Sequence, residues 1–347
     1  MNHPKVAIVI LNFNGRHFLE KFLPSVINFS NNCNIYVADN ASTDDSVAYL
    51  KKTFNKTVNV IEITNNYGYA KGYNIALKQI QADYFVLLNS DVEVTENWTQ
   101  PIIDLMENNK KIAACQPKLI DFKNKKLFEY AGASGGFIDN YGYPFCRGRI
   151  FNNIESDNGQ YNNATEVFWA TGACLFVNAM AFWEVGGLDD DYFAHMEEID
   201  LCWRLKNIGY SIYVEPKSLV YHVGGGTLNK LSSRKTFLNF RNNLITLTKN
   251  HPDNFLFFKL VFRLILDGIA GIKFLLEGQP KHFFAVIKAH FAYYYLLPNT
   301  LNKRKQLKNL QHFKFSKSFI YKGNIVFDYF LKQKTIFSKF HETKFFR

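Results

Sequence analysis

The chain has 347 residues, 47% of them hydrophobic, and its 41 Lys and Arg residues outnumber 30 Asp and Glu residues to give a net charge of +11. A chain of this length and apolar content can bury a sizeable core, which excludes intrinsic disorder. Five cysteines without a C-x-x-C pair exclude a disulfide framework and a zinc site, and they indicate reduced thiols in a cytoplasmic protein. The first residues lack a basic start followed by an apolar run, so we expect no secretion signal.

The positive charge is concentrated at the C-terminal end. Residues 301–347 hold twelve Lys or Arg residues and two acidic residues, whereas residues 1–300 are nearly neutral. A partner that responds to net charge should therefore meet residues 301–347, and the rest of the chain needs another chemical explanation.

The first 120 residues alternate two hydrophobic patterns. Apolar, β-branched runs predict strands at 6–11, 35–38, 58–63 and 84–88, and helical spacing appears between them, as in residues 18–27. This alternation predicts an α/β fold with a mostly parallel sheet flanked by helices. Such sheets bind their ligands at the carboxyl ends of the strands.

Polar residues follow each of these predicted strands, at positions 12–15, 39–45, 64–68 and 89–91. The first turn lacks G-x-G-x-x-G, which argues against a dinucleotide site. Asn12 and Phe13 offer amide groups and an aromatic face suited to a nucleobase, although an ordinary turn has the same composition. Asp39 can accept a hydrogen bond from a base or ribose. Asp91 suits a divalent cation shared with a diphosphate, or it is a solvated turn acid.

Residues 121–165 are rich in Gly, Asn and Tyr and predict an irregular connection. Order returns with an apolar run at 167–177, helices at 179–185 and 196–208, and strands at 211–214 and 219–222.

Three carboxylates begin the second of these helices. Asp200 and Arg204 are four positions apart and can pair on one helical face, whereas Glu198 points elsewhere. A carboxylate at a helix N-terminus is favoured in its ionised form and can accept a proton from an attacking hydroxyl. The alternative is that the acids, Glu197 above all, merely favour a helix start.

His222 ends the last predicted strand and precedes a glycine run at 224–226. Its imidazole can bind a metal or a phosphate, and the loose backbone can approach a phosphate group. A loop histidine beside a flexible linker is the alternative.

Five segments in this order, residues 9–15, 37–46, 65–74, 88–91 and 172–204, resemble the family 2 glycosyltransferases of GT-A fold. Within that family the sequence is most similar to bacterial rhamnosyltransferase-like members, over about residues 5–250. The resemblance implies an inverting transfer from a nucleotide-diphosphate sugar with Mg²⁺ or Mn²⁺ as cofactor. It assigns donor binding to Leu11, Asn12, Phe13, Asp39, Asn65, Gly68, Lys71, Asn89 and Ser90.

The resemblance also implies the reacting groups. Glu198 holds the position of the family's catalytic base, with Glu197 and Asp200 as supporting acids. Asp91 matches the last Asp of the D-x-D metal motif, Asn89 replaces the first, and His222 is expected to help bind the metal and diphosphate. The expected acceptor side consists of Trp169, Thr171, Gly172 and Ala173, with core packing an equal alternative for the tryptophan.

Residues 254–297 are dense in apolar side chains, but charged residues recur every fourth position, as at Lys259, Arg263 and Asp267. Amphipathic helices fit this pattern, and no uncharged run is long enough to span a bilayer. We therefore expect a glycosyltransferase domain at 1–250 and a basic, Phe-rich helical extension at 251–347. An anionic membrane surface is the favoured partner of the extension, which would place the protein on the inner face of the cell membrane. A solvated helical extension or a homodimer interface is the alternative, and no nucleic-acid module accompanies the charge.

The sequence thus predicts an enzyme that extends a glycan or a lipid-linked oligosaccharide in cell-surface polysaccharide synthesis. A sugar nucleotidyltransferase is one alternative, but the first turn lacks a Gly-rich, basic loop for a triphosphate. A catalytically silent, membrane-associated glycan-binding protein is the other.

Overall fold

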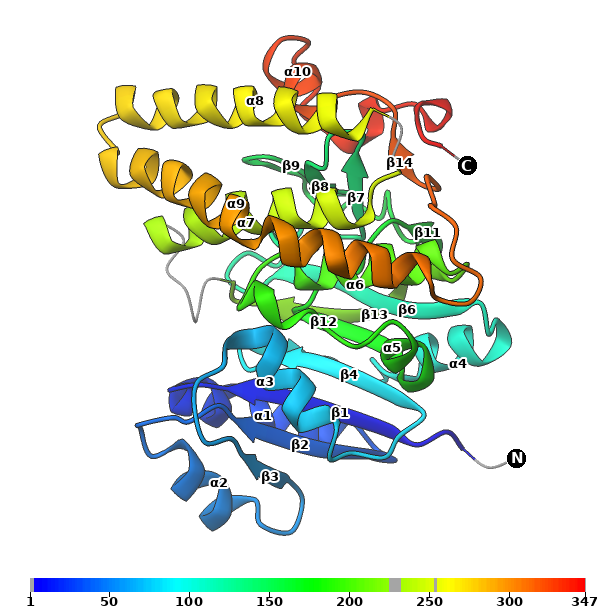
Figure 1. The fold of residues 1–347 in the computed structure, drawn as a ribbon. Helices are drawn as coiled ribbons and strands as arrows, with labels where there is room; N and C mark the ends of the chain where they lie inside the picture. The colour runs from blue at the N-terminus through cyan, green and yellow to red at the C-terminus, as the bar shows by residue number, and fades with distance from the viewer. Residues whose placement is uncertain (1–2, 225–231, 253–254, 347) are drawn as a thin grey trace.

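A computed structural model describes residues 3–224, 232–252 and 255–346 (Figure 1). Its described residues form a nine-stranded sheet in the order β11-β13-β6-β12-β4-β1-β2-β3, with β5 paired to β13. The strands are β1 (Val6–Asn12), β2 (Cys33–Asp39), β3 (Asn59–Glu62), β4 (Tyr84–Asn89), β5 (Val92–Val94), β6 (Ile112–Asp121), β11 (Thr165–Val167), β12 (Cys174–Asn178) and β13 (Ser211–His222).

The four strands predicted in the first 120 residues are confirmed, and β1 to β4 pair in parallel. The expected strands at 211–214 and 219–222 are instead one strand, β13, which runs parallel to β6 with an irregular register between Glu215 and Leu219. Strand β12 lies antiparallel between β4 and β6, so the sheet is mixed. The predicted fold class is therefore confirmed.

Some of the helices cover the two faces of this sheet, and others pack outside it. The helices of the described residues are α1 (Arg16–Phe29), α2 (Ser46–Thr53), α3 (Gly68–Leu77), α4 (Gln100–Asn108), α5 (Ala179–Glu184), α6 (Glu197–Asn207), α7 (Ser233–Asn250), α8 (Leu256–Leu276), α9 (Pro280–Lys308) and α10 (Ile325–Phe330). Alternate residues of β1 point to opposite faces. Ala7 and Val9 share a core with α3, α5 and α6, whereas Ile8 and Ile10 share one with α1 and α4.

Residues 121–165 are not simply irregular, because they contribute most of a second sheet. Its order is β10-β9-β8-β7-β14, with β7 (Gly136–Asp139), β8 (Pro144–Cys146), β9 (Arg149–Ile150), β10 (Asn153–Ile154) and β14 (Ile320–Tyr321). These strands have two to four residues each, which is too short for a visible alternation. All five cysteines are free thiols.

Helices α8 and α9 form a hairpin in which they pack against each other. Helix α9 also packs along α7 (Figure 1). The chain then returns, so that β14 pairs with β7. The predicted boundary at residue 250 stays a prediction, and the two segments that it separates share one sheet. Within the described residues, no helix is long and apolar enough to cross a membrane.

Candidate active site

Side-chain hydrogen bonds connect the ends of β1 and β2. Asn12 pairs in register with Asp39, and its Nδ2 donates to Asp39 Oδ1 at 3.0 Å and to Ser42 Oγ at 3.1 Å. The backbone N–H of Ser42 donates to the other oxygen of Asp39 at 2.9 Å. Both residues are buried, and Asn12 Oδ1 has no hydrogen-bond partner among the described residues. Asp39 therefore shapes this turn, and its expected contact with ribose stays a prediction.

The start of α3 forms the next part of the rim. Gly68 has a φ of +78°, and a Cβ there would lie 2.5 Å from the carbonyl oxygen of Phe193, so only glycine fits this close approach. The Lys71 ammonium lies 4.5 Å from the centre of the Tyr67 ring. Asn65 is exposed and donates to the Tyr67 hydroxyl at 3.2 Å. These side chains edge the predicted donor site.

Strand pairing brings Asp91 to His222. Asp91 lies in the turn between β4 and β5, and Val92 of β5 pairs with His222 of β13. The Nε2 atom of His222 is 3.1 Å from Asp91 Oδ1 and 3.5 Å from Asn89 Nδ2. Asp91 and His222, which were expected to bind the metal and diphosphate, thus come together with Asn89, which was expected to bind the donor, while the roles of all three stay predictions.

Sequence reasoning missed Glu129, which approaches the other side of the same imidazole. Glu129 Oε1 lies 3.2 Å from His222 Nδ1. Burial alone would lower the pKa of His222, but the carboxylates of Glu129 and Asp91 outweigh it and raise that pKa to about 10. Glu129 falls in the segment expected to be irregular, where no residue pattern singled it out.

These residues fit a divalent cation with few protein ligands. Among the residues that the structure describes, no three His, Cys, Asp or Glu side chains are placed so that they could hold one metal ion together. Asp91 Oδ1 and His222 Nε2 nevertheless converge, and one carboxylate completed by phosphate oxygens and water is typical of Mg²⁺.

Glu198 lies in the first turn of α6, beside the donor rim. A Cβ at Gly172 would lie 2.9 Å from the hydroxyl of Tyr69 and 3.7 Å from Cβ of Glu198. The Tyr69 hydroxyl, which sequence reasoning also missed, donates to the carbonyl of Gly172 at 2.6 Å. The base candidate, the α3 helix and the predicted acceptor strand therefore meet at Gly172.

Burial, rather than the helix dipole, dominates the acidity of these carboxyls. Burial raises the pKa of Glu198 to about 7, although backbone amides, including that of Gly172, favour its charged form. The expectation that the helix start favours ionisation is thus outweighed at this position. Burial and the charge of Glu198 raise the pKa of Glu197 well above its ordinary value, so Glu197 is neutral when Glu198 ionises.

Asp200 is occupied by structural partners. It accepts from Arg204 Nε at 2.8 Å, as the spacing predicted, and from Lys249 Nζ at 2.8 Å and Asn250 Nδ2 at 2.7 Å. Asp200 is fully buried. Both carboxylate oxygens therefore already accept hydrogen bonds from protein groups, so neither is available to take a proton from a substrate.

The expected acceptor residues divide into two groups. Trp169 is 3% exposed, and its Nε1 donates to the carbonyl of Phe137 at 2.8 Å. The ring packs in the core against Gly136, as the alternative to stacking on a sugar predicted. Thr171 is also buried, with its N–H donating to Gln116 at 3.0 Å. Gly172 lies next to Glu198, as described above.

Ala173 and Ser90 lie where the expected acceptor residues meet the expected donor residues. The Ala173 carbonyl accepts from the Asn89 N–H at 2.9 Å, which ties the acceptor strand to the end of β4. Ser90 Oγ lies beside Gly15, where a Cβ would be 2.4 Å from Asn12 Oδ1. Leu11 packs against Gly72 of α3. Of the glycine run after His222, only Gly224 lies within the described residues.

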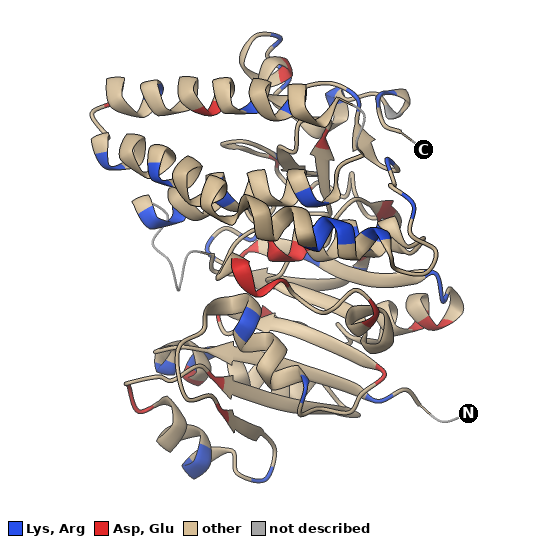
Figure 2. Ribbon diagram, in the orientation of Figure 1, with Lys and Arg blue, Asp and Glu red and all other residues tan. Residues whose placement is uncertain are grey.

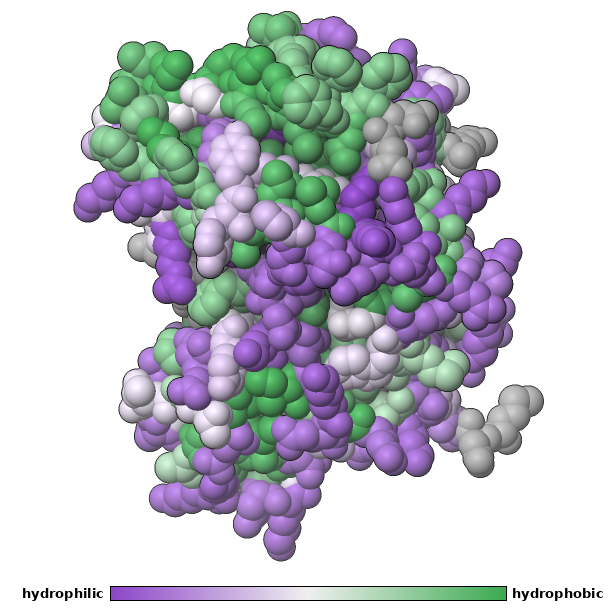
Figure 3. All heavy atoms as spheres, viewed as in Figure 1, coloured by the Kyte–Doolittle hydropathy of each residue, from purple (hydrophilic) through white to green (hydrophobic). Residues whose placement is uncertain are grey.

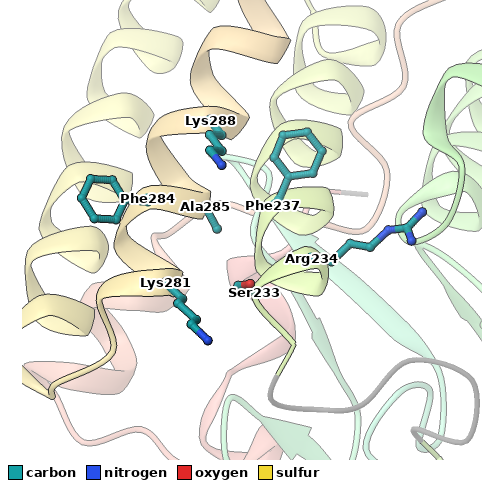
Figure 4. Close-up of a pocket in the computed structure, with 7 residues that line it drawn as sticks. All are labelled: Ser233, Arg234, Phe237, Lys281, Phe284, Ala285 and Lys288. Carbon is teal, nitrogen blue, oxygen red and sulfur yellow. The ribbon is translucent and has the colours of Figure 1, made fainter.

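Acidic residues gather around the start of α6, and basic residues along the end of α9 (Figure 2). A hollow of about 650 Å³ lies between the start of α7 and α9 (Figure 4). Phe237, Lys281 and Lys288 line it, and no predicted site residue does. Arg234, at its edge, points away from α9 and lies 4.7 Å from the ring of Phe193, in the turn before α6.

A mixed sheet of this order, with polar residues at its strand ends and a carboxylate at the start of α6, agrees with the GT-A fold expected of a sugar-transferring enzyme. The family model described as "Glycosyl transferase family 2" matches residues 7–186, just over half of the chain. The chain therefore belongs to glycosyl transferase family 2.

Two relatives and one solved structure agree with this. The chain is 24% identical over 240 residues to the N-acetylglucosaminyl-diphospho-decaprenol L-rhamnosyltransferase of Mycobacterium tuberculosis, covering 64% of this chain and 77% of that protein. It is 25% identical over 277 residues to the dTDP-rhamnosyl transferase RfbF of Shigella flexneri, covering 74% and 86%. The structure of GalNAc-T7 with UDP, GalNAc and Mn²⁺ superposes with a TM-score of 0.58 at 16% identity, over 73% of this chain and about half, 49%, of that chain. The predicted likeness to rhamnosyltransferases is confirmed.

Proposed function

We propose that the protein transfers a hexosyl or deoxyhexosyl group, with inversion, from a nucleotide-diphosphate sugar to a hydroxyl of a glycan or lipid-linked oligosaccharide. The observation that carries this proposal is the position of Glu198, a partly buried carboxylate beside Gly172 with a pKa of about 7. A base with that pKa is half ionised at neutral pH and accepts a proton efficiently there.

The proposed chemistry needs one base. Glu198 accepts the proton of the acceptor hydroxyl while that oxygen bonds to the anomeric carbon from the face opposite the diphosphate. The bond from the anomeric carbon to the diphosphate oxygen breaks, and its electron pair leaves with the phosphate. Asp200 stabilises the base helix through Arg204 and Lys249 instead of taking part in the chemistry.

The donor is proposed to lie along the rim formed by β1, β2 and α3. Asn12, Phe13 and Asp39 would contact the base and ribose, and Lys71 would meet the diphosphate. Asp91 and His222 would hold Mg²⁺ or Mn²⁺, which supplies charge neutralisation of the diphosphate when bound. The convergence of Asp91 Oδ1 and His222 Nε2 supports this assignment.

The names of the relatives suggest which substrates to try first. One relative is a dTDP-rhamnosyl transferase, and another acts on a diphospho-decaprenol. We therefore propose a deoxyhexosyl donor and a lipid-linked acceptor as the first candidates for this chain.

The experiment is a donor panel. The purified protein is incubated with dTDP-L-rhamnose, UDP-GalNAc or GDP-mannose, with Mn²⁺, Mg²⁺ or EDTA, and the released nucleoside diphosphate is measured. We expect slow, metal-dependent release from one donor, abolished in Asp91→Ala. Release from none of them, together with no shift of the unfolding temperature by any donor, would contradict a donor site of this class.

We also propose that the α8–α9 hairpin lies on the anionic inner face of the cell membrane. One side of α8 carries an apolar stripe of exposed residues at helical spacing, visible as a hydrophobic band in Figure 3. The stripe consists of Phe258, Val261, Ile265, Ile269, Ile272 and Leu276, each between 41% and 83% exposed. A monomeric protein seldom exposes so long an apolar face to water.

Charge favours lipid over a second copy of the chain as the occupant of this stripe. Residues 256–308 hold nine Lys or Arg residues and two acidic ones. A symmetric homodimer would bring together the net positive charges of two hairpins, which repel, whereas an anionic leaflet would attract that charge. The basic tail itself is folded back, because Arg304 donates to the carbonyls of Thr248 and His251 and Lys303 pairs with Asp191. The hairpin, rather than a free tail, is therefore the proposed contact.

A further inference from the structure

The turn that precedes the base helix has an unusual backbone. Phe193, His195 and Met196 have φ values of 54°, 69° and 74°, in the left-handed region that residues other than glycine rarely adopt. Met196 is the N-cap of α6, so this turn sets the direction in which the first turn of α6, with Glu198, leaves. A backbone of this kind persists only where its surroundings hold it.

Asn242 of α7 holds the turn in this conformation through its side-chain amide. Its side chain is fully buried, and Nδ2 lies within hydrogen-bond distance of three carbonyl oxygens of the turn, those of Tyr192 at 3.0 Å, Ala194 at 2.9 Å and His195 at 2.7 Å. Its Oδ1 accepts from Arg241 Nε at 2.8 Å, which fixes the orientation of the amide.

Two further contacts fasten the same turn from opposite sides. Arg241 Nη2 donates to the carbonyl of Asp191 at 2.9 Å. On the donor side, the carbonyl of Phe193 accepts from the N–H of Tyr69, at the start of α3. The turn is therefore held between the donor rim and α7, a helix that lies outside the residues matched by the family model.

We propose that Asn242 is a positioning residue for sugar transfer, which fixes the turn at residues 192–196 and thereby aims Glu198 at the acceptor hydroxyl. This inference rests on the proposed function of Glu198. Asn242 is too deeply buried to touch substrate, so its effect passes through the backbone of the turn. Displacement of a reacting group by about 1 Å costs on the order of 100-fold in rate.

The neighbouring Asn243 provides a matched control. It is also buried on α7, and its amide makes two short hydrogen bonds, to the Gly142 carbonyl and from Arg263, both at 2.6 Å. Those partners belong to the loop after β7 and to α8, away from the turn. Asn242→Ala and Asn243→Ala therefore remove similar bonds from the same helix, and only the first releases the base helix.

The test compares both variants in the donor panel, with the donor that the wild type hydrolyses and with thermal unfolding measured in parallel. We expect Asn242→Ala to lower kcat by roughly 10- to 100-fold with little change in the KM for the donor. Asn243→Ala should lose comparable thermal stability and keep kcat near the wild-type value. Equal losses of kcat in the two variants, or an unchanged kcat in Asn242→Ala, would overturn the proposal.

A milder change covers the case in which Asn242→Ala does not fold. Arg241 is partly exposed, so Arg241→Gln should fold, lose the bond to the Asp191 carbonyl and lower kcat in the same direction by a smaller factor. An unchanged kcat in Arg241→Gln would then count against the proposal. A wild type that neither hydrolyses any donor nor is stabilised by one would contradict the proposed function itself, whereas wild-type turnover with an unaffected Asn242→Ala would contradict the positioning role alone.

Discussion

Nε2 of His222 lies 3.1 Å from Oδ1 of Asp91, although 131 positions separate the two residues. The short strand β5 makes this contact, because it follows Asp91 directly and pairs with the end of β13. Glu129 lies on the other side of the His222 imidazole, next to Nδ1. A carboxylate that binds Nδ1 leaves Nε2 directed at the proposed metal position, which is the usual support of a metal-binding histidine.

Glu129→Gln should therefore weaken metal binding without unfolding the protein. The amide cannot stabilise the imidazole orientation as the carboxylate does, and the loss of such a supporting residue typically costs about 10- to 100-fold in metal affinity. Titration of Mn²⁺ in the presence of UDP or dTDP, followed by thermal shift, measures this affinity. Glu155→Gln serves as the control, because Glu155 bonds to Tyr161 and lies outside the site. A Mn²⁺ affinity equal to that of the wild type would show that Glu129 does not support metal binding.

The rate of donor hydrolysis should rise as the pH increases through about 7. Glu198 has its pKa raised by burial to about 7, so it is mostly protonated at pH 6 and mostly ionised at pH 8, and only the ionised form is a base. Initial rates between pH 5.5 and 8.5, at saturating donor and metal, measure this limb. A carboxyl with its ordinary pKa would give a flat profile over that range, and a flat profile would contradict the assignment.

Asp200→Asn should destabilise the fold rather than act on the chemistry. The change leaves the buried Arg204 and Lys249 without their shared carboxylate, and breaking a buried pair costs about 3–5 kcal/mol. The free energy of unfolding in urea measures this loss. Asp45→Asn is the control, because Asp45 is exposed and its pair with Arg16 contributes less than about 1 kcal/mol. Equal stability in the two variants would show that Asp200 does not stabilise the fold through Arg204 and Lys249.

The apolar stripe of α8 should be required for binding to anionic vesicles. The double variant Ile265→Glu and Ile269→Glu places two charges on the stripe and should abolish sedimentation with phosphatidylglycerol vesicles. Met180→Glu is the control, because Met180 is an apolar residue on the distant helix α5 that is even more exposed, 80% against 56% for Ile265 and 58% for Ile269.

Two results would contradict the membrane contact. Vesicle binding that is unchanged in the double variant would show that the stripe is not the contact. A concentration-dependent dimer that the double variant dissociates, with no vesicle binding by the wild type, would assign the stripe to a second copy of the chain instead.

Much of the donor rim could be predicted because parallel strands end at a common edge. The runs of apolar residues in the first 120 positions located β1 to β4, and the residues after them, Asn12, Asp39 and Asp91, lie on that edge. The pairing of Asp200 with Arg204 followed from helical spacing alone.

The other features of the site depend on tertiary contacts, which the hydrophobic periodicity of the sequence does not reveal. Glu129 and Tyr69 reach the site from an irregular segment and from a helix face, and no spacing relates them to His222 or Glu198. Whether Trp169 stacks on a sugar or packs in the core was left open by the sequence, because an aromatic residue beside a site and one in the core have the same sequence neighbours. The pKa of Glu198 depends on burial that the helix start alone does not reveal.

The most direct test of the account is the turnover of Glu198→Gln with the donor that the panel identifies. The amide keeps the size of the side chain and removes the base, so the rate of nucleoside diphosphate release should fall by at least about 100-fold. Donor binding, measured by thermal shift with Mn²⁺, should remain at the wild-type level. Turnover within a few-fold of the wild type, with the same donor affinity, would show that Glu198 is not the base.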